Sequence, residues 1–122
     1  MGDKAKKRIF SGVQPSGHLT LGNYLGALKN FALLQDEYDC IYCVVDLHSL
    51  TVRQNPEELR HRSYSVLALY IACGLDVNDL NTFLYRQSRI SAHSEMCVLL
   101  NNFTGFGELS RQTQFKDKFR AV

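Results

Sequence analysis

Residues 10–23 read FSGVQPSGHLTLGN, and the organisation of the whole chain follows from this stretch. A short strand from Arg8 to Ser11 is predicted to run into a loop rich in glycine, proline and serine. A helix is predicted to follow, because apolar residues recur at helical spacing. They are Leu21, Tyr24, Leu25, Leu28, Phe31 and Ala32. A strand, a glycine-rich loop and a helix N-terminus can bind an anion through free N–H groups and the helix dipole. The stretch therefore predicts a nucleotide site, with a plain turn as the alternative.

Gly22 strengthens the nucleotide interpretation. It falls in the first turn of the predicted helix, where helix propensity disfavours glycine. A residue without a side chain lets a flat ring or a phosphate approach the backbone closely. We therefore expect Gly22 to serve a ligand.

The remaining elements alternate between strand and helix. Strands are predicted over 40–45 and 82–85, and a helix is predicted between them. That helix has an N-cap at Asn55, Pro56 in its first turn and Gly74 after its end. Its predicted buried face consists of Leu59, Ser63, Val66, Leu67, Tyr70 and Ile71.

Two more helices are predicted in the last third of the chain. The first is capped by Ser91, and its apolar stripe reads as core packing. The stripe consists of Met96, Leu99, Leu100 and Phe103. The second is a short basic helix over 108–119.

This order of elements predicts an α/β fold, the N-terminal half of a doubly wound parallel sheet of the Rossmann type. Three parallel strands with crossover helices take the order 3-2-1 when the crossovers are right-handed. The first strand is then an exposed edge, where the second half of such a sheet would pair. We therefore expect the sheet to be incomplete and the chain to be part of something longer.

Composition is that of a globular domain, and charge is concentrated at the two ends. Residues 1–8 are basic and are predicted to form a flexible tail, which leaves 9–122 as the domain. The net charge of +2 would not by itself suggest a nucleic-acid binder. No apolar run approaches the roughly 18 residues that span a bilayer, and the N-terminus lacks a signal-peptide core. We expect no membrane association and a cytoplasmic location.

The polar and sulfur-bearing residues suggest one site and no metal centre. Cys40 and Cys43 form an isolated C-x-x-C within a predicted buried strand, so they are expected to be core thiols, as are Cys73 and Cys97. His48 follows the second strand, at the end where parallel sheets bind ligands. A core histidine bonded to backbone is the alternative.

The chain resembles the bacterial-type tryptophanyl-tRNA synthetases, which are class I enzymes. The segment GVQPSGHLTLGN at 12–23 is similar to their ATP-binding signature, in which TLGN stands in for the usual HxGH. The similarity continues through VDLH at 45–48, TVRQ at 51–54, GELSR at 107–111 and TQFKDK at 113–118. The resemblance thus covers residues 8 to about 118 and implies the N-terminal part of a catalytic domain.

The resemblance implies a reaction, its substrates and its site residues. The reaction is ATP-dependent activation of L-tryptophan, followed by transfer to tRNA(Trp), in a homodimer. Thr20, Asn23 and Lys116 would take part in catalysis. ATP would be bound by Gln14, Pro15, Ser16, Gly22, Asn23 and Lys116. Mg²⁺ would be carried by the phosphates, with no protein metal site. The tryptophan pocket would include Phe10, Gly12, Val45 and His48.

Two elements of the resembled family do not occur in these residues, and two other functions stay open. The Lys-Met-Ser-Lys-Ser loop and the acid that reads the indole N–H are both missing, so we expect the chain alone to be inactive. One alternative is another nucleotidyltransferase of the same superfamily fold, against which QPSG at 14–17 and the 108–118 string both argue. The other is a non-catalytic nucleotide-binding fragment, or a truncated paralogue that acts as an interaction module.

Overall fold

The computed structural model describes residues 6–17 and 20–120. These residues form two compact units, 6–89 and 90–120.

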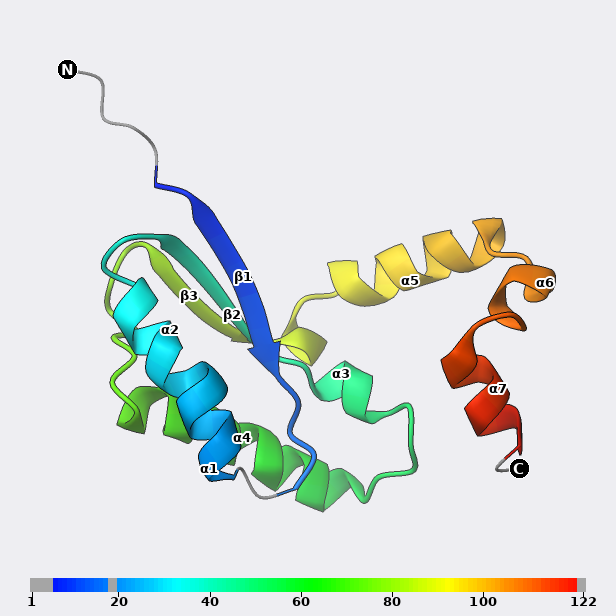
Figure 1. Ribbon diagram of the computed structural model, residues 1–122, viewed down its shortest axis with the longest axis horizontal. Coiled ribbons are helices and arrows are strands. Elements are labelled where there is room, and N and C mark those ends of the chain that lie inside the picture. Colours follow the sequence, from blue (N-terminus) through cyan, green and yellow to red (C-terminus); the bar gives the residue numbers. More distant parts are fainter. Residues whose placement is uncertain (1–5, 18–19, 121–122) are drawn as a thin grey trace. The chain divides into compact units, whose positions relative to one another are not determined.

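The first unit is built on a parallel sheet of three strands in the order β1-β2-β3 (Figure 1). The strands are β1 (Arg8–Val13), β2 (Asp39–Val44) and β3 (Thr82–Arg86). The predicted order is confirmed, and β1 is an edge of the described sheet. β1 extends two residues beyond the predicted end, while β2 lies one residue earlier than predicted and leaves Val45 outside the strand.

Helical segments connect the strands. The first connection contains α1 (Leu21–Asn23), the π-helical turn η1 (Tyr24–Leu28) and α2 (Lys29–Leu34). The second contains the short α3 (Asp46–Ser49) and the long α4 (Pro56–Ala72), and the 3₁₀ turn η2 (Gln87–Arg89) follows β3. α2 and α4 lie on the same side of the sheet (Figure 1), where their apolar residues form one core with β2.

Three aromatic rings form the centre of that core. Phe31 on α2 stacks on Tyr42 of β2 with 4.3 Å between ring centroids, and Tyr70 of α4 stacks on Phe31 at 5.6 Å. Both buried hydroxyl groups have partners, as buried polar groups require. Tyr42 Oη donates to the carbonyl oxygen of Phe31 (3.1 Å), and Tyr70 Oη donates to that of Cys43 (3.4 Å). The stack therefore joins both helices to the central strand.

The opposite face of the sheet is open in the first unit. Phe10, Ile41 and Phe83 are paired across the three strands. Phe10 is 63% exposed and Phe83 is 61% exposed. The carboxyl ends of the strands and this open face are where the predicted pocket residues lie.

The π-helical turn changes which residues the first helical segment buries. Leu28 and Phe31 are buried as predicted, whereas Leu21, Tyr24 and Leu25 are exposed and the prediction for them is wrong. A π turn places five residues where a regular helix places four, so the residues before it are rotated relative to those after it. That rotation turns the first part of the predicted apolar face to solvent.

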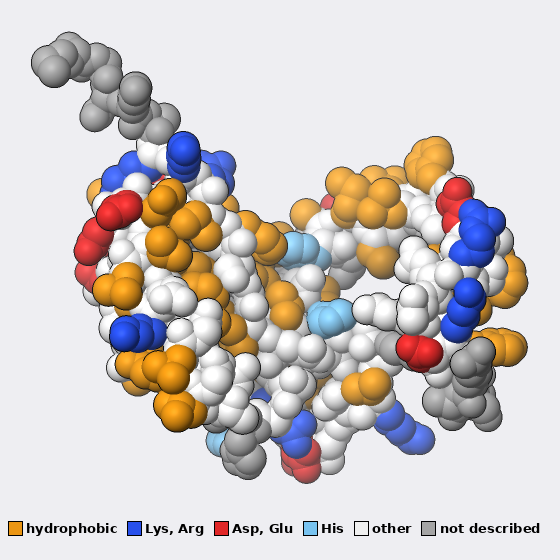
Figure 2. All heavy atoms as spheres, viewed as in Figure 1, with side chains coloured by type: hydrophobic (Ala, Val, Ile, Leu, Met, Phe, Trp, Pro, Cys, Tyr) orange, Lys and Arg blue, Asp and Glu red, His pale blue; other side chains and the backbone are white. Residues whose placement is uncertain are grey.

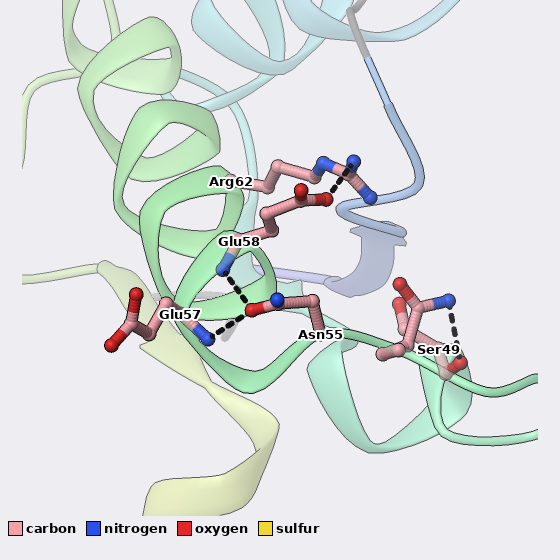
Figure 3. Close-up of polar contacts among 6 residues, drawn as sticks. Ser49, Asn55, Glu57, Glu58 and Arg62 are labelled. Atoms are coloured by element: carbon pink, nitrogen blue, oxygen red, sulfur yellow. Dashed lines mark hydrogen bonds and ion pairs between the residues drawn. The ribbon is translucent and has the colours of Figure 1, made fainter.

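The ends of α4 agree with the sequence. Asn55 Oδ1 accepts hydrogen bonds from the backbone N–H groups of Glu57 (2.9 Å) and Glu58 (3.3 Å), as Figure 3 shows. Gly74 has φ = +101°, the left-handed conformation predicted for it. Glu58 does not complete a capping box, because its carboxylate pairs with Arg62 at 2.7 Å (Figure 3). Ile71 is exposed, so its predicted place on the buried face is wrong.

The second unit is helical and differs from prediction in its packing. It contains α5 (Ala92–Phe103), α6 (Phe106–Leu109) and α7 (Thr113–Arg120). The predicted helix over 108–119 is thus broken, with residues 110–112 between α6 and α7. α5 buries none of its residues, so its stripe is exposed apolar surface, visible in Figure 2, and the prediction of core packing is wrong. Cys97 is likewise exposed rather than a core thiol, and Cys73 is half-buried, whereas Cys40 and Cys43 are buried as predicted.

Two remaining predictions concern the N-terminus and membranes. Residues 1–5 of the predicted tail lie outside the described residues, while Lys6 Nζ donates to the carbonyl oxygen of Asp36 (2.9 Å) and Arg8 is already part of β1. In the part of the chain that the structure describes, no helix combines the length and the apolar character that crossing a bilayer requires.

Candidate functional site

The loop after β1 combines a buried anchor with an exposed turn. Pro15 is fully buried, while Gln14 is half-buried and Ser16 is exposed. The N–H of Ser16 donates to the carbonyl oxygen of Gln14 (2.9 Å), which tightens the turn. Gly17 follows with φ = +100°, a conformation that L side chains rarely adopt. Of the three residues of this loop predicted to bind ATP, Ser16 therefore lies at the surface, Gln14 is partly accessible and Pro15 is buried.

Thr20 and Asn23 form a small polar unit at the start of α1. Asn23 Oδ1 accepts two hydrogen bonds from Thr20, one from its backbone N–H (2.8 Å) and one from its hydroxyl (2.9 Å). These bonds occupy the hydroxyl hydrogen of Thr20 and orient the Asn23 amide. The two side chains predicted to face the triphosphate are thus already paired with each other, and both are exposed.

Gly22, between them, is exposed and has free space beside it. Among the described residues outside its own helix backbone, a Cβ built on Gly22 would meet Thr20 Oγ1 at 3.5 Å, an ordinary contact. The described residues therefore do not require glycine at this position. This fits a residue that is kept small for a ligand.

The four residues predicted for the tryptophan pocket lie in the same unit, at two places. Phe10 and Gly12 are on the open face of β1, and Val45 and His48 follow the end of β2. A Cβ on Gly12 would be 3.1 Å from Cγ1 of Val45, so those two positions are in contact. His48 lies on α3 with an exposed side chain, which speaks against the alternative of a buried core histidine.

Lys116 lies in the second unit. It is exposed on α7 and borders a pocket of about 340 Å³ together with three phenylalanines and a serine. These are Phe106, Ser110, Phe115 and Phe119. The rings of Phe106 and Phe115 meet edge to face, with 5.6 Å between centroids.

Sequence reasoning missed a buried carboxylate next to Val45 in the first unit. Asp46, the first residue of α3, is 7% exposed. Its Oδ1 accepts from the N–H of Ser88 (2.9 Å) and its Oδ2 from the Ser88 hydroxyl (2.5 Å). Nε of Arg86 lies 3.3 Å from the same Oδ2. The sequence did contain a signal for this contact. Asp46 and Ser88 follow neighbouring parallel strands, and the carboxyl ends of such strands meet at one edge of the sheet.

The Arg86 side chain also reaches α4. Its guanidinium carbon lies 5.2 Å from the centre of the Tyr64 ring, a cation–π geometry. A hydrogen bond with Arg89 and the positive charge of Arg86 hold the pKa of the Tyr64 hydroxyl below its usual range. An open pocket of about 210 Å³ lies beside this pair, and Asp46, Arg86 and Arg60 are among its lining residues.

The environment of Cys43 does not favour a reactive thiolate. Burial raises the pKa of the Cys43 thiol, which therefore stays protonated near neutral pH. Its neighbour Tyr85 is affected in the same way, and burial raises the pKa of that hydroxyl to about 12. Across residues 6–17 and 20–120 no group of three or more His, Cys, Asp or Glu side chains could hold a metal ion.

A family model described as "tRNA synthetases class I (W and Y)" matches residues 3–121. The tryptophan--tRNA ligase of Clostridium tetani is 65% identical over 113 residues, which are 93% of this chain and 33% of that protein. The tryptophan--tRNA ligase of Clostridium perfringens is 58% identical over 122 residues, 100% of this chain and 36% of that protein. The chain therefore spans about a third of the length of these curated relatives.

Solved structures agree with these sequence matches. The tryptophanyl-tRNA synthetase of Campylobacter jejuni superposes with a TM-score of 0.82 at 30% identity, covering 95% of this chain and 36% of that one. A complex of the same enzyme with ADP and tryptophan gives a TM-score of 0.81 at 31% identity, covering 93% and 35%. At this coverage the likeness extends over nearly the whole chain.

Proposed function

This chain belongs to the class I tRNA synthetases of the tryptophan and tyrosine family, and we propose that it works as the ATP-binding part of a tryptophan--tRNA ligase. The activity would require a protein as long as the relatives, with this chain as one part of it, and we call that protein the longer protein. In that protein the chain would supply one wall of the catalytic crevice, and the remainder would supply the other.

The observation that carries the proposal is the β1–α1 loop with its Thr20–Asn23 pair and the unobstructed Gly22. We infer that Gln14, Pro15, Ser16, Gly22 and Asn23 bind ATP there. Gly22 would leave room for the adenine, and Ser16 with neighbouring N–H groups would hold phosphate. Lys116 would add a positive charge at the phosphates in the assembled site.

In the first step the carboxylate of tryptophan attacks the α-phosphorus of ATP. A new P–O bond forms, the bond to the β-phosphate breaks, and pyrophosphate leaves with its electron pair. The loop residues would contribute by alignment and by neutral hydrogen-bond donors rather than by covalent chemistry. Because Thr20 donates both its backbone N–H and its hydroxyl hydrogen to Asn23 Oδ1, it would act by orienting Asn23, whose amide N–H groups would meet the phosphates with little reorganisation.

The Mg²⁺ ion that such a reaction uses would arrive with the nucleotide. Residues 10–23 contain hydroxyl and amide groups but no carboxylate. Mg²⁺ is commonly held by one or two carboxylates together with substrate phosphates, so this loop fits an ion that the phosphates carry. It would neutralise phosphate charge there.

The amino acid would bind beside β1 and β2. Phe10 and Gly12 on the open face, with Val45 and His48, would form part of the indole pocket. Gly12 on β1 and Val45 just after β2 are neighbouring positions, which supports this grouping. The tryptophanyl group would then pass to tRNA(Trp), and we propose a homodimer working in the cytoplasm.

A second candidate function is nucleotide binding without catalysis, as part of an interaction module. The β1–α1 loop is local to one strand–loop–helix unit and could bind ATP alone. Both functions predict ATP binding, so binding does not separate them.

The test is ATP–pyrophosphate exchange by the longer protein, with tryptophan, with tyrosine or with neither. Exchange that depends on tryptophan and not on tyrosine is expected. Exchange that depends on tyrosine alone would instead indicate a tyrosine-specific member of the family. ATP binding with no exchange would favour the non-catalytic module.

A further inference from the structure

Asp46 is a buried carboxylate whose oxygens are held from the end of the next strand. Ser88, in η2, donates hydrogen bonds from its backbone N–H to Oδ1 of Asp46 (2.9 Å) and from its hydroxyl to Oδ2 (2.5 Å). Hydrogen bonds to a charged oxygen are short and strong, and a buried carboxylate without them would be costly. The ends of β2 and β3 are therefore joined by one side chain.

A second side chain ties this carboxylate to α4. Arg86 Nε is 3.3 Å from Asp46 Oδ2, and the side chain is 15% exposed. The Nε–H makes no hydrogen bond to the described residues, so its pairing with Asp46 is electrostatic. The Tyr64 ring, 5.2 Å from the guanidinium carbon, gives the arginine its orientation. Three elements thus meet at Asp46.

These contacts keep the short helix α3 in position. A helix of four residues is not stable on its own, because one hydrogen-bonded turn does not offset the free-energy cost of helix nucleation. Its two ends are anchored instead, at the start by Asp46 and at the end by Gln54, whose Nε2 donates to the carbonyl oxygen of Ser49 (3.2 Å, Figure 3). Val45 precedes Asp46 and His48 lies two residues after it. The position of both pocket residues depends on this anchor.

We propose that Ser88 and Arg86 are positioning residues for the amino-acid side of the site, acting through Asp46 to hold Val45 and His48 in place. The inference rests on the proposed function. The nucleotide side has separate support, since the described residues on either side of positions 18–19 are held by the Thr20–Asn23 and Ser16–Gln14 hydrogen bonds and by buried Pro15. Loosening α3 should therefore affect tryptophan and spare ATP.

The test compares Ser88→Ala and Arg86→Leu with the unsubstituted longer protein, by ATP–pyrophosphate exchange and by calorimetric binding of each substrate. The KM and Kd for tryptophan should rise about tenfold, a loss of about 1.4 kcal/mol of binding free energy. The KM for ATP should stay within about twofold. Ser88→Thr keeps both donors and should restore tryptophan binding.

Thr82→Val is the matched control. Thr82 Oγ1 donates to Asp79 Oδ2 (2.8 Å) near the opposite end of β3, so its loss also removes a hydroxyl–carboxylate bond. It should lower the Tm as Ser88→Ala does, without changing the KM for tryptophan.

Two outcomes would overturn the inference in distinguishable ways. If the unsubstituted protein shows no tryptophan-dependent exchange, the proposed function fails and this inference falls with it. If exchange is normal but Ser88→Ala raises both KM values equally, or Thr82→Val has the same effect, the contacts at Asp46 serve stability alone.

Discussion

A Cβ on Gly12 would lie 2.8 Å from the carbonyl oxygen of Cys43, closer than real Cβ atoms come to any backbone atom. The two residues are paired between β1 and β2, so the edge strand packs against the central strand without room for a methyl group. Glycine at position 12 is a requirement of the sheet as well as a candidate for the pocket.

Gly12→Ala should therefore destabilise the protein. The neighbour is backbone and cannot move aside, and overpacking of this kind costs about 1–3 kcal/mol. Urea unfolding followed by circular dichroism measures the loss. Gly26→Ala is the control, because a Cβ there meets no described residue outside its own helix backbone within 4 Å and alanine favours helices, so the free energy of unfolding should be unchanged or slightly higher. Equal effects of the two substitutions would contradict the packing argument.

Gly22→Val should impair ATP use without unfolding the protein. The space beside Gly22 is open, so the valine side chain would enter the volume that we assign to the nucleotide. In the longer protein the KM for ATP should rise about tenfold or more, or kcat should fall by as much, while tryptophan binding and the Tm change little. Normal ATP–pyrophosphate exchange by Gly22→Val would refute the assignment of this turn.

His48→Ala should weaken tryptophan more than ATP. Because the imidazole is exposed on α3, its removal should leave the Tm within about 2 °C, as for other surface substitutions. Titration of each substrate separates the two affinities. A lowered Tm with equal loss of both substrates would instead identify a structural histidine.

Asn55→Ala should destabilise α4. The substitution removes the oxygen that accepts from the N–H groups of Glu57 and Glu58, a loss of about 1 kcal/mol. Asn55→Asp keeps the acceptor and adds a negative charge at the helix N-terminus, so it should retain stability. The two variants are compared by chemical unfolding. An alanine variant as stable as the aspartate variant would contradict the capping role.

The 122 residues alone should not catalyse exchange at a useful rate. They contain the β1–α1 loop and part of the pocket but no Lys-Met-Ser-Lys-Ser sequence. Loss of one preorganised donor typically costs about 10²- to 10³-fold, and here a whole wall is missing. Exchange within tenfold of that of the longer protein would show that the chemistry resides in these residues.

Sequence predicted those features that depend on neighbours along the chain. Asn55, Pro56 and Gly74 define the ends of α4 because caps and left-handed positions are local. The contact of Arg86 with Asp46 was not predictable in this way, since 40 residues separate them and an arginine in a strand gives no sign of its partner. The stripe on α5 shows a related limit. Periodicity identifies an apolar face but not whether anything covers it.

The π-helical turn at Tyr24–Leu28 holds one residue more than a regular turn, so a deletion inside it differs from a deletion elsewhere in the first crossover. A single deletion within Tyr24–Leu28 would leave regular turns of 3.6 residues, and Leu21, Gly22 and Asn23 would keep nearly the direction they now face. A single deletion within α2 would instead rotate everything before it by about 100° relative to the residues that follow. The protein should therefore accept a single-residue deletion in the π turn far more readily than one in α2.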